Sequence, residues 1–147
     1  MSVPTEADFA IVRAKVGSGS TYDPICGIEN VSINKTVNAN DSYRRDCAKP
    51  GIPGARKNKV TGKSLTISAS GGSNVDNIVQ FESLLGIAHD YQVELRNQDG
   101  SDTGVLLGTY TGRFMMMSDN MATSSGGDSS GEITLNNEGP WTYAEAA

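Results

Sequence analysis

The best candidate for a catalytic residue is a serine in a short segment that begins and ends with glycine. Residues 127–131 read Gly-Asp-Ser-Ser-Gly, which resembles the Gly-Asp-Ser-Gly-Gly of trypsin-like proteases. In those enzymes a histidine base must lie within hydrogen-bond reach of the serine, and His89 is the one histidine here. The match fails at its fourth position, and 147 residues are too few for two barrels. A hydrolase using Ser129 is therefore the weakest of three hypotheses, and we predict no catalytic residues.

Metal-binding patterns are also incomplete. Residues 99–102 (Asp-Gly-Ser-Asp) resemble the start of a calcium-binding loop, but Tyr110 stands at the twelfth position, where an acidic ligand is needed. Cys26, Cys47 and His89 lack the number and spacing of a four-ligand zinc site. We therefore predict neither a metal nor a cofactor. Whether the two cysteines form a single bridge or stay reduced is left open.

Two further patterns could bind small molecules. Residues 62–64 (Gly-Lys-Ser) end like a phosphate-binding loop, but Lys57 stands where the first glycine belongs. Trp141 and Tyr143 could stack on a sugar, which gives the second hypothesis, a monomeric β-sandwich module that binds a carbohydrate or other ligand. The alternative is that this aromatic pair packs on a sheet and closes the domain.

Basic side chains gather in residues 38–63, a Gly- and Pro-containing stretch that we call the basic arm. Its members are Arg44, Arg45, Lys49, Arg56, Lys57, Lys59 and Lys63. Seven positive charges could hold nucleic-acid phosphates. The arm has a single aromatic residue, however, and the whole chain is acidic, with a net charge of -5, whereas dedicated nucleic-acid binders are usually basic. Contact with an acidic protein surface is the better interpretation.

Two alternating segments must position this arm. Residues 31–37 (VSINKTV) and 63–70 (KSLTISAS) alternate apolar with polar side chains, which indicates half-buried β-strands. The connection between them is about 26 residues, whereas hairpin loops usually have two to five. The sequence therefore predicts a long loop between the second and third strands.

The rest of the chain is typical of an all-β domain with one helix. A helix is expected over residues 74–85, with Asn74 as its N-cap. Its apolar stripe would be Val75, Ile78, Val79 and Leu85. Other strands are expected at residues 9–16, 25–37, 91–97, 105–117 and 131–137, with a Ser/Gly loop at 118–131. We predict one mainly β domain over residues 1–147, a two-sheet β-sandwich or barrel with one flanking α-helix.

Charge is distributed unevenly along the chain. Residues 1–70 carry ten basic and six acidic side chains, whereas residues 71–147 carry two basic and eleven acidic ones. Copies of such a chain can attract one another, acidic face to basic arm, although two solvated faces are the alternative. An N-terminal apolar run and a stretch of about 20 apolar residues are both lacking, so we expect neither a signal peptide nor membrane insertion.

Four stretches carry a family resemblance: residues 26–37 (CGIENVSINKTV), 41–57 (DSYRRDCAKPGIPGARK), 61–65 (TGKSL) and 130–135 (SGEITL). With the order of strands, arm, helix and Ser/Gly loop, they resemble the major tail tube protein of long-tailed, siphophage-like bacteriophages. The resemblance implies a structural protein whose hexameric rings stack into a hollow tube that delivers the genome into the host. It also implies that the loop between the second and third strands reaches the neighbouring ring.

Residues and partners follow from that resemblance. The contacts between subunits and rings would use Arg44, Arg45, Lys49, Arg56, Lys57 and Lys59. The lumen-facing candidates are Ser32, Asn34, Thr36, Ser64, Thr66 and Ser68. The partners would be other copies of the chain, tail tip or initiator, terminator and tape measure proteins, and genomic DNA that passes without sequence-specific binding. The protein would be made in the bacterial host cytoplasm and end in the virion tail.

Overall fold

The computed structural model describes residues 5–17 and 19–146. Its elements are β1 (Phe9–Lys15), β2 (Tyr22–Pro24), β3 (Ile28–Arg44), β4 (Ala55–Gly71), the 3-10 turn η1 (Val75–Asn77), α1 (Ile78–Leu84), β5 (Ala88–Asn97), β6 (Val105–Ala122) and β7 (Ser130–Glu145). Within the described residues, neighbouring strands pair antiparallel in one sheet of order β2-β1-β5-β6-β7-β4-β3. The prediction of a mainly β chain with one helix is confirmed.

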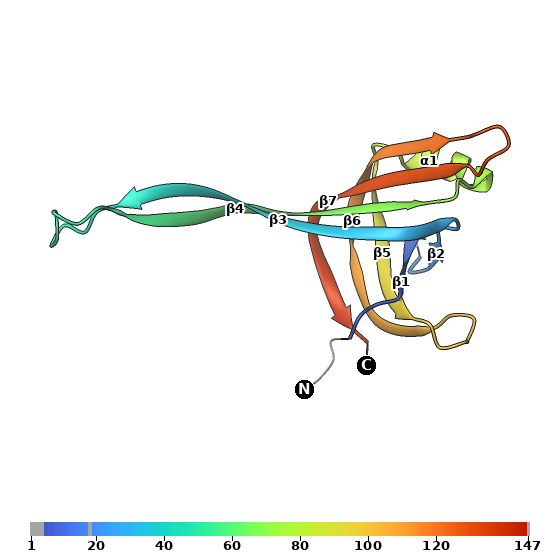
Figure 1. Ribbon diagram of the computed structural model, residues 1–147, viewed down its shortest axis with the longest axis horizontal. Coiled ribbons are helices and arrows are strands. Elements are labelled where there is room, and N and C mark those ends of the chain that lie inside the picture. Colours follow the sequence, from blue (N-terminus) through green and yellow to red (C-terminus); the bar gives the residue numbers. More distant parts are fainter. Residues whose placement is uncertain (1–4, 18, 147) are drawn as a thin grey trace.

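The expected second sheet is not confirmed. β6 and β7 are long strands that run through both walls of the domain, so one continuous sheet forms both walls. Near its start, β6 pairs with β5, and from Ser118 to Ala122 it pairs with β7 alone among the described strands. Register shifts between Gly112 and Phe114 and between Met116 and Ser118 mark where the ladder bends. The single sheet therefore curls until β1 lies against β3 (Figure 1).

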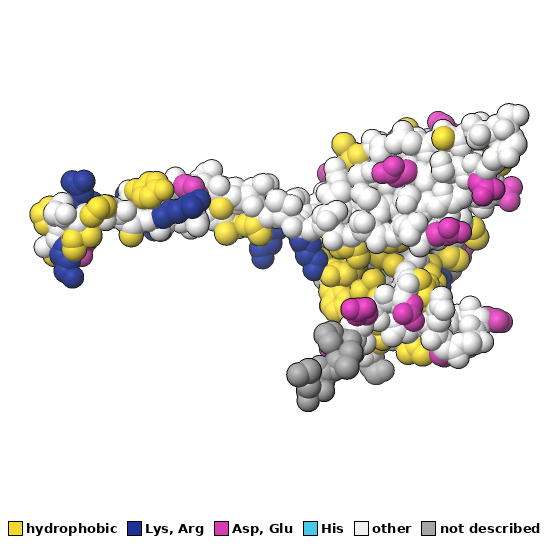
Figure 2. Space-filling view, viewed as in Figure 1, with side chains coloured by type: hydrophobic (Ala, Val, Ile, Leu, Met, Phe, Trp, Pro, Cys, Tyr) yellow, Lys and Arg dark blue, Asp and Glu magenta, His cyan; other side chains and the backbone are white. Residues whose placement is uncertain are grey.

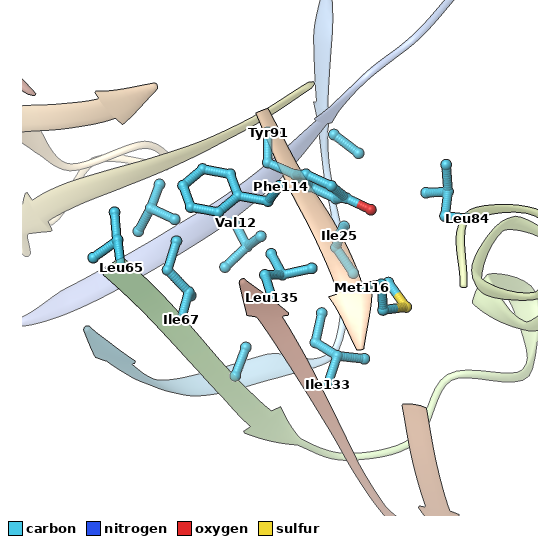
Figure 3. Packing of buried hydrophobic residues seen from close by; sticks show 13 residues of the cluster. Val12, Ile25, Leu65, Ile67, Leu84, Tyr91, Phe114, Met116, Ile133 and Leu135 are labelled. Atoms are coloured by element: carbon cyan, nitrogen blue, oxygen red, sulfur yellow. The ribbon is translucent and has the colours of Figure 1, made fainter. Parts of the chain in front are cut away.

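The core fills the space inside this curl. Tyr91 of β5 and Phe114 of β6 lie on one side, and Leu65, Ile67 and Leu135 of β4 and β7 lie on the other (Figure 3). All five side chains are fully buried. The apolar parity predicted for residues 63–70 is confirmed at Leu65 and Ile67, because alternate side chains of a strand point to the same face.

The basic arm is a β-hairpin, so the predicted long loop between the strands is wrong. β3 and β4 are 17 residues each, and they stay paired from Ile28 and Gly71 to Arg44 and Ala55. Only residues 45–54, which we call the arm tip, lie between the strands. Polar strands pair through backbone hydrogen bonds, and the apolar periodicity that the prediction relied on does not report these bonds. Figure 1 shows the hairpin projecting far from the body.

The helix is shorter than predicted and turns a different face to the core. Asn74 caps the 3-10 turn as expected, because its side chain accepts a hydrogen bond from the Asp76 N–H. Val75 and Val79 of the expected stripe are 72% and 81% exposed. Leu84 is buried instead and Phe81 packs against the core cluster. The first turn is a 3-10 turn, which has fewer residues per turn than an α-helix. The apolar stripe predicted from α-helical spacing is therefore wrong.

The Ser/Gly loop is also shorter than residues 118–131. β6 continues to Ala122 and β7 begins at Ser130, which leaves residues 123–129 as the loop. Asn120 pairs with Glu132, and Met121 pairs with Gly131. Both strands thus continue into polar sequence, as they do in the arm.

Candidate functional site

The residues expected for serine chemistry are not arranged for it. The Ser129 hydroxyl receives a hydrogen bond from Ser73 at 2.8 Å. His89 lies in β5, and its Nε2 is 2.7 Å from the Lys15 carbonyl oxygen. Each group is therefore occupied by a different partner, and the arrangement offers Ser129 no base.

The calcium-like stretch forms a turn. The Asp99 carboxylate accepts hydrogen bonds from both the backbone N–H and the hydroxyl of Ser101. These bonds lower the pKa of Asp99, as expected for a carboxylate that accepts donors. Over residues 5–17 and 19–146, no group of three or more His, Cys, Asp and Glu side chains could hold a metal ion. No helix in this part of the chain is long and apolar enough to cross a membrane.

The two cysteines do not bridge. Cys26 and Cys47 are both free and exposed. Cys26 precedes β3 and Cys47 follows it, so the length of the arm strand separates them. The open question of a bridge within one chain is answered against it.

The aromatic pair proposed for sugar stacking packs partly against its neighbours, and Tyr143 remains 49% exposed. Trp141 packs against the core cluster. The Tyr143 ring lies 4.8 Å from the Tyr110 ring, between centroids, and the Lys35 ammonium lies 4.8 Å from the Tyr110 centroid. The packing of Trp141 on the core cluster supports the closing role of the aromatic pair, because it ties the last strand to the core.

The six lumen-facing candidates come together on one side of the sheet. They form three directly opposed pairs of β3 and β4: Ser32 with Ser68, Asn34 with Thr66, and Thr36 with Ser64. Because the buried Leu65, Ile67 and Ala69 alternate with them, these side chains point away from the core. The sequence thus predicted their common face, and its role as a lumen stays a prediction.

This face continues onto β6 and β7, which the sequence analysis expected as strands but did not place on this face. Thr134 of β7 pairs with Ser68 on one side and with Ser118 of β6 on the other. Asn136 pairs with Thr66, and the Thr66 hydroxyl is 3.1 Å from its side-chain oxygen. We call the outward side chains of residues 30–36, 64–70, 118–120 and 132–136 in these four strands the polar sheet face. The alternation of apolar and polar side chains in residues 133–136 could have identified Thr134 and Asn136 as outward residues. It could not show which strand lies beside them.

The polar sheet face contains neither lysine nor arginine. Its other outward pairs are Asn30 with Ser70, Ser70 with Glu132, and Asn120 with Glu132. In Figure 2 most of the blue Lys and Arg side chains lie along the arm and at its base, whereas the upper part of the body is mostly white with scattered acidic groups and a yellow hydrophobic region lies below it. The face is thus polar without being positively charged.

Two strand edges flank the polar sheet face and, in the described part of the chain, both lack a neighbouring strand. β3 is the last strand of the sheet, and residues 118–122 of β6 pair with β7 alone. Three antiparallel steps separate these edges, so β3 and β6 run in opposite directions. Exposed edges of this kind readily pair with another chain.

The basic residues of the arm do not form a single patch. Lys57 lies opposite Ser42, Lys59 lies opposite Asn40, and the strand alternation places Arg44 on their side of the hairpin. Arg56 is on the other side, where it forms a 2.6 Å ion pair with Asp41. Arg45 and Lys49 belong to the arm tip.

Comparison with known proteins gives matches in structure alone. No protein-family profile matches the chain, and no curated protein matches its sequence. The structure is similar to a chain from the tail of an empty gene transfer agent particle, determined by helical refinement with C6 symmetry. That match has a TM-score of 0.62 and 20% identity, and it covers 91% of this chain and 94% of the other.

Two further structures match over nearly the full length. A chain of the virion of a native gene transfer agent particle has a TM-score of 0.66 and 17% identity, with 96% and 99% of the two chains covered. A chain of the sheath–tube complex of an extracellular contractile injection system, in its extended state, has a TM-score of 0.64 and 17% identity, with 97% and 93% covered. At these identities the likeness establishes a fold shared with chains of tail and injection assemblies.

Proposed function

We propose that this protein is a non-enzymatic structural subunit of a tail tube in a phage-like virion. The observation that carries the proposal is the polar sheet face, bounded by two unpaired edges on β3 and β6. A fold shared along more than nine tenths of the chain with components of tails and a sheath–tube complex supports the same function. The protein would act by its shape and its self-assembly.

Ring closure follows from the two edges. A contact between β3 of one copy and the end of β6 of the next uses two different surfaces, so it generates a closed ring or a helix. Because β3 and β6 run in opposite directions, copies related by rotation about the strand direction would continue the antiparallel ladder. Six copies per ring would agree with the C6 symmetry of the similar gene transfer agent tail.

The lumen of such a ring would be the polar sheet face. Clustered lysine and arginine bind nucleic-acid phosphates and release counterions, so a channel for DNA must avoid them. The pairs Ser32–Ser68, Asn34–Thr66 and Thr36–Ser64 offer short neutral groups instead. Genomic DNA would then pass without sequence-specific binding.

The remaining partners belong to the tube as a whole. The basic arm would reach the adjacent ring, because it projects from the body and carries seven of the 12 lysine and arginine residues of the chain (Figure 2). A tail tip or initiator protein, a terminator and a tape measure protein would set where the tube begins, ends and how long it grows. The assembled protein would reside in the virion tail.

A lysine placed on the polar sheet face tests the lumen. Thr66→Lys should leave rings visible by negative-stain electron microscopy, yet reduce DNA delivery of reconstituted particles at least tenfold, since it adds one cation per subunit to the channel. Gln98→Lys is the matched control, because Gln98 is exposed in the β5–β6 turn and carries the same charge change. Normal delivery by the Thr66→Lys particles would show that this face does not line the channel.

A further inference from the structure

A small apolar cavity lies at the end of the sheet opposite the arm. α1 and the loop before β3 cover it, and its volume is about 50 Å³. Its apolar lining includes Ile25, Ile28, Phe81, Met121 and Ile133. A space of this size holds the end of one side chain, which is how a single anchor residue binds at a protein interface. We call it the end cavity.

The wall of the end cavity is acidic and lacks a matching cation. Asp119 lines it, whereas its lining contains neither lysine nor arginine. Burial raises the pKa of Asp119, and the nearby charge of Glu82 raises it further. The ion pairs of the described chain involve other carboxylates: Asp41, Asp90 and Glu94. A positive group from another chain would relieve this repulsion.

The arm tip has the complementary chemistry. Ile52 is 56% exposed and has a proline at the next position, and Lys49 and Arg45 supply positive charge nearby in the chain. Local backbone bonds shape the tip, since the Ile52 N–H donates to the Lys49 carbonyl at 3.2 Å and the Lys49 N–H donates to the Asp46 carbonyl at 3.1 Å. An apolar anchor on a preformed turn loses little conformational freedom when it binds.

A chain cannot place its own arm tip in its own end cavity. β3 begins at Ile28, which lines the cavity, and ends at Arg44, next to the arm tip. Its 17 residues span roughly 55 Å at about 3.3 Å per residue. The two surfaces therefore lie at opposite ends of the same hairpin, and a contact between them must join different copies head to tail.

We propose that Ile52 of one subunit inserts into the end cavity of a subunit in the adjacent ring, where Lys49 pairs with Asp119. This contact rests on the proposed tube function and identifies the surface that receives the arm. It joins two different surfaces, so it does not close on itself and propagates from ring to ring. Each subunit would give one arm and receive one.

The two native cysteines report this contact directly. Cys26 lines the end cavity and Cys47 lies in the arm tip, and both thiols are free and exposed. A short bismaleimide added to the concentrated wild-type protein should give a ladder of covalent dimers, trimers and longer chains on a denaturing gel. Cys26→Ser and Cys47→Ser should each abolish the ladder and leave the monomer band, and a mixture of the two variants should restore a cross-linked dimer.

A substitution of the anchor tests the energetic role. Ile52→Ser should raise the protein concentration at which stacks form at least tenfold, since tenfold corresponds to about 1.4 kcal/mol and burying an isoleucine contributes more than that. Val60→Ser is the matched control, because Val60 is also 56% exposed but lies on the shaft of the arm. Lys49→Glu and Asp119→Lys should each prevent stacking, and the double variant should stack again.

The outcomes separate this contact from the function on which it rests. Stacks that form without the cysteine ladder, or that tolerate Ile52→Ser as well as Val60→Ser, would overturn the contact and leave the tube function standing. A protein that forms neither rings nor stacks at any concentration, with or without cross-linker, would overturn both.

Discussion

At the scale of single residues, Tyr91 is the most unusual group of the core. Its hydroxyl is buried and has no hydrogen-bond partner in the described structure. Burial raises the pKa of Tyr91 to about 12, because the phenolate would lose its hydration. Since the folded-state pKa is raised, neutral Tyr91 contributes stability fully below about pH 10, and this contribution is lost as the pH rises toward about 12.

Tyr91→Phe removes the hydroxyl and keeps the ring. We expect the free energy of unfolding at pH 7 to stay equal or rise by about 1 kcal/mol, because a buried donor without a partner is costly. We also expect the loss of stability between about pH 10 and 12 to become smaller. Urea unfolding followed by circular dichroism at several pH values measures both effects.

Tyr110→Phe is the control for that change. The Tyr110 hydroxyl accepts a hydrogen bond from Lys35 at 2.7 Å, so its removal should cost about 0.5–1.5 kcal/mol. A loss from Tyr91→Phe as large as that from Tyr110→Phe would mean that the Tyr91 hydroxyl is satisfied in solution.

At the scale of elements, the arm is an exposed two-stranded ribbon. In the part of the arm far from the body, all side chains of residues 40–44 and 56–59 are exposed. The Arg56–Asp41 ion pair is exposed as well and contributes about 0–1 kcal/mol at most. Isolated hairpins are marginally stable in water, so the arm should open far more often than the core strands.

Hydrogen exchange should separate the arm from the body. In the monomer, the backbone amides of residues 40–44 and 55–59 should exchange at least a hundredfold faster than those of Ile67 and Leu135, which lie in the buried core. In stacked rings the arm amides should become slow. Mass spectrometry of both preparations measures this, and core-like protection of the arm in the monomer would contradict the prediction.

At the scale of the whole molecule, charge is divided between the arm and the body. Residues 38–63 carry seven basic and two acidic side chains, whereas the rest of the chain carries five basic and fifteen acidic ones. Copies stacked head to tail would bring the positive arm of one against the negative body of the next. Like charges would otherwise hold the bodies apart.

Salt should therefore shorten stacks more than it disrupts rings. Raising ionic strength from 0.1 M to 1 M reduces the Debye length from about 10 Å to about 3 Å, which weakens the arm contacts but not backbone pairing at strand edges. Stack length by negative-stain microscopy should fall, while rings remain. A chain with Lys57→Gln and Lys59→Gln should form shorter stacks at low salt and respond less to added salt, since both lysines lie on one side of the arm.

Alternation along the chain was enough to predict the common polar side of residues 31–37 and 63–70, which form part of the polar sheet face. In a strand every second side chain points the same way, so the common side of Ser64, Thr66 and Ser68 can be read from local sequence. The charge of the arm and the cap at Asn74 are local features too, and the cap was predicted correctly. The lumen, the rings and the arm contacts remain predictions, because they depend on other copies of the chain.

The remaining features depend on which segments become neighbours. Thr134 and Ser118 join the polar sheet face because β7 pairs with β4 and β6, and periodicity within one strand carries no information about its partner. The arm is a hairpin because polar backbones pair as well as apolar ones, so residues 38–63 gave no apolar signal of it. The end cavity exists where α1, β4, β6 and β7 meet, and packing between distant segments creates such a space without a mark in any one of them.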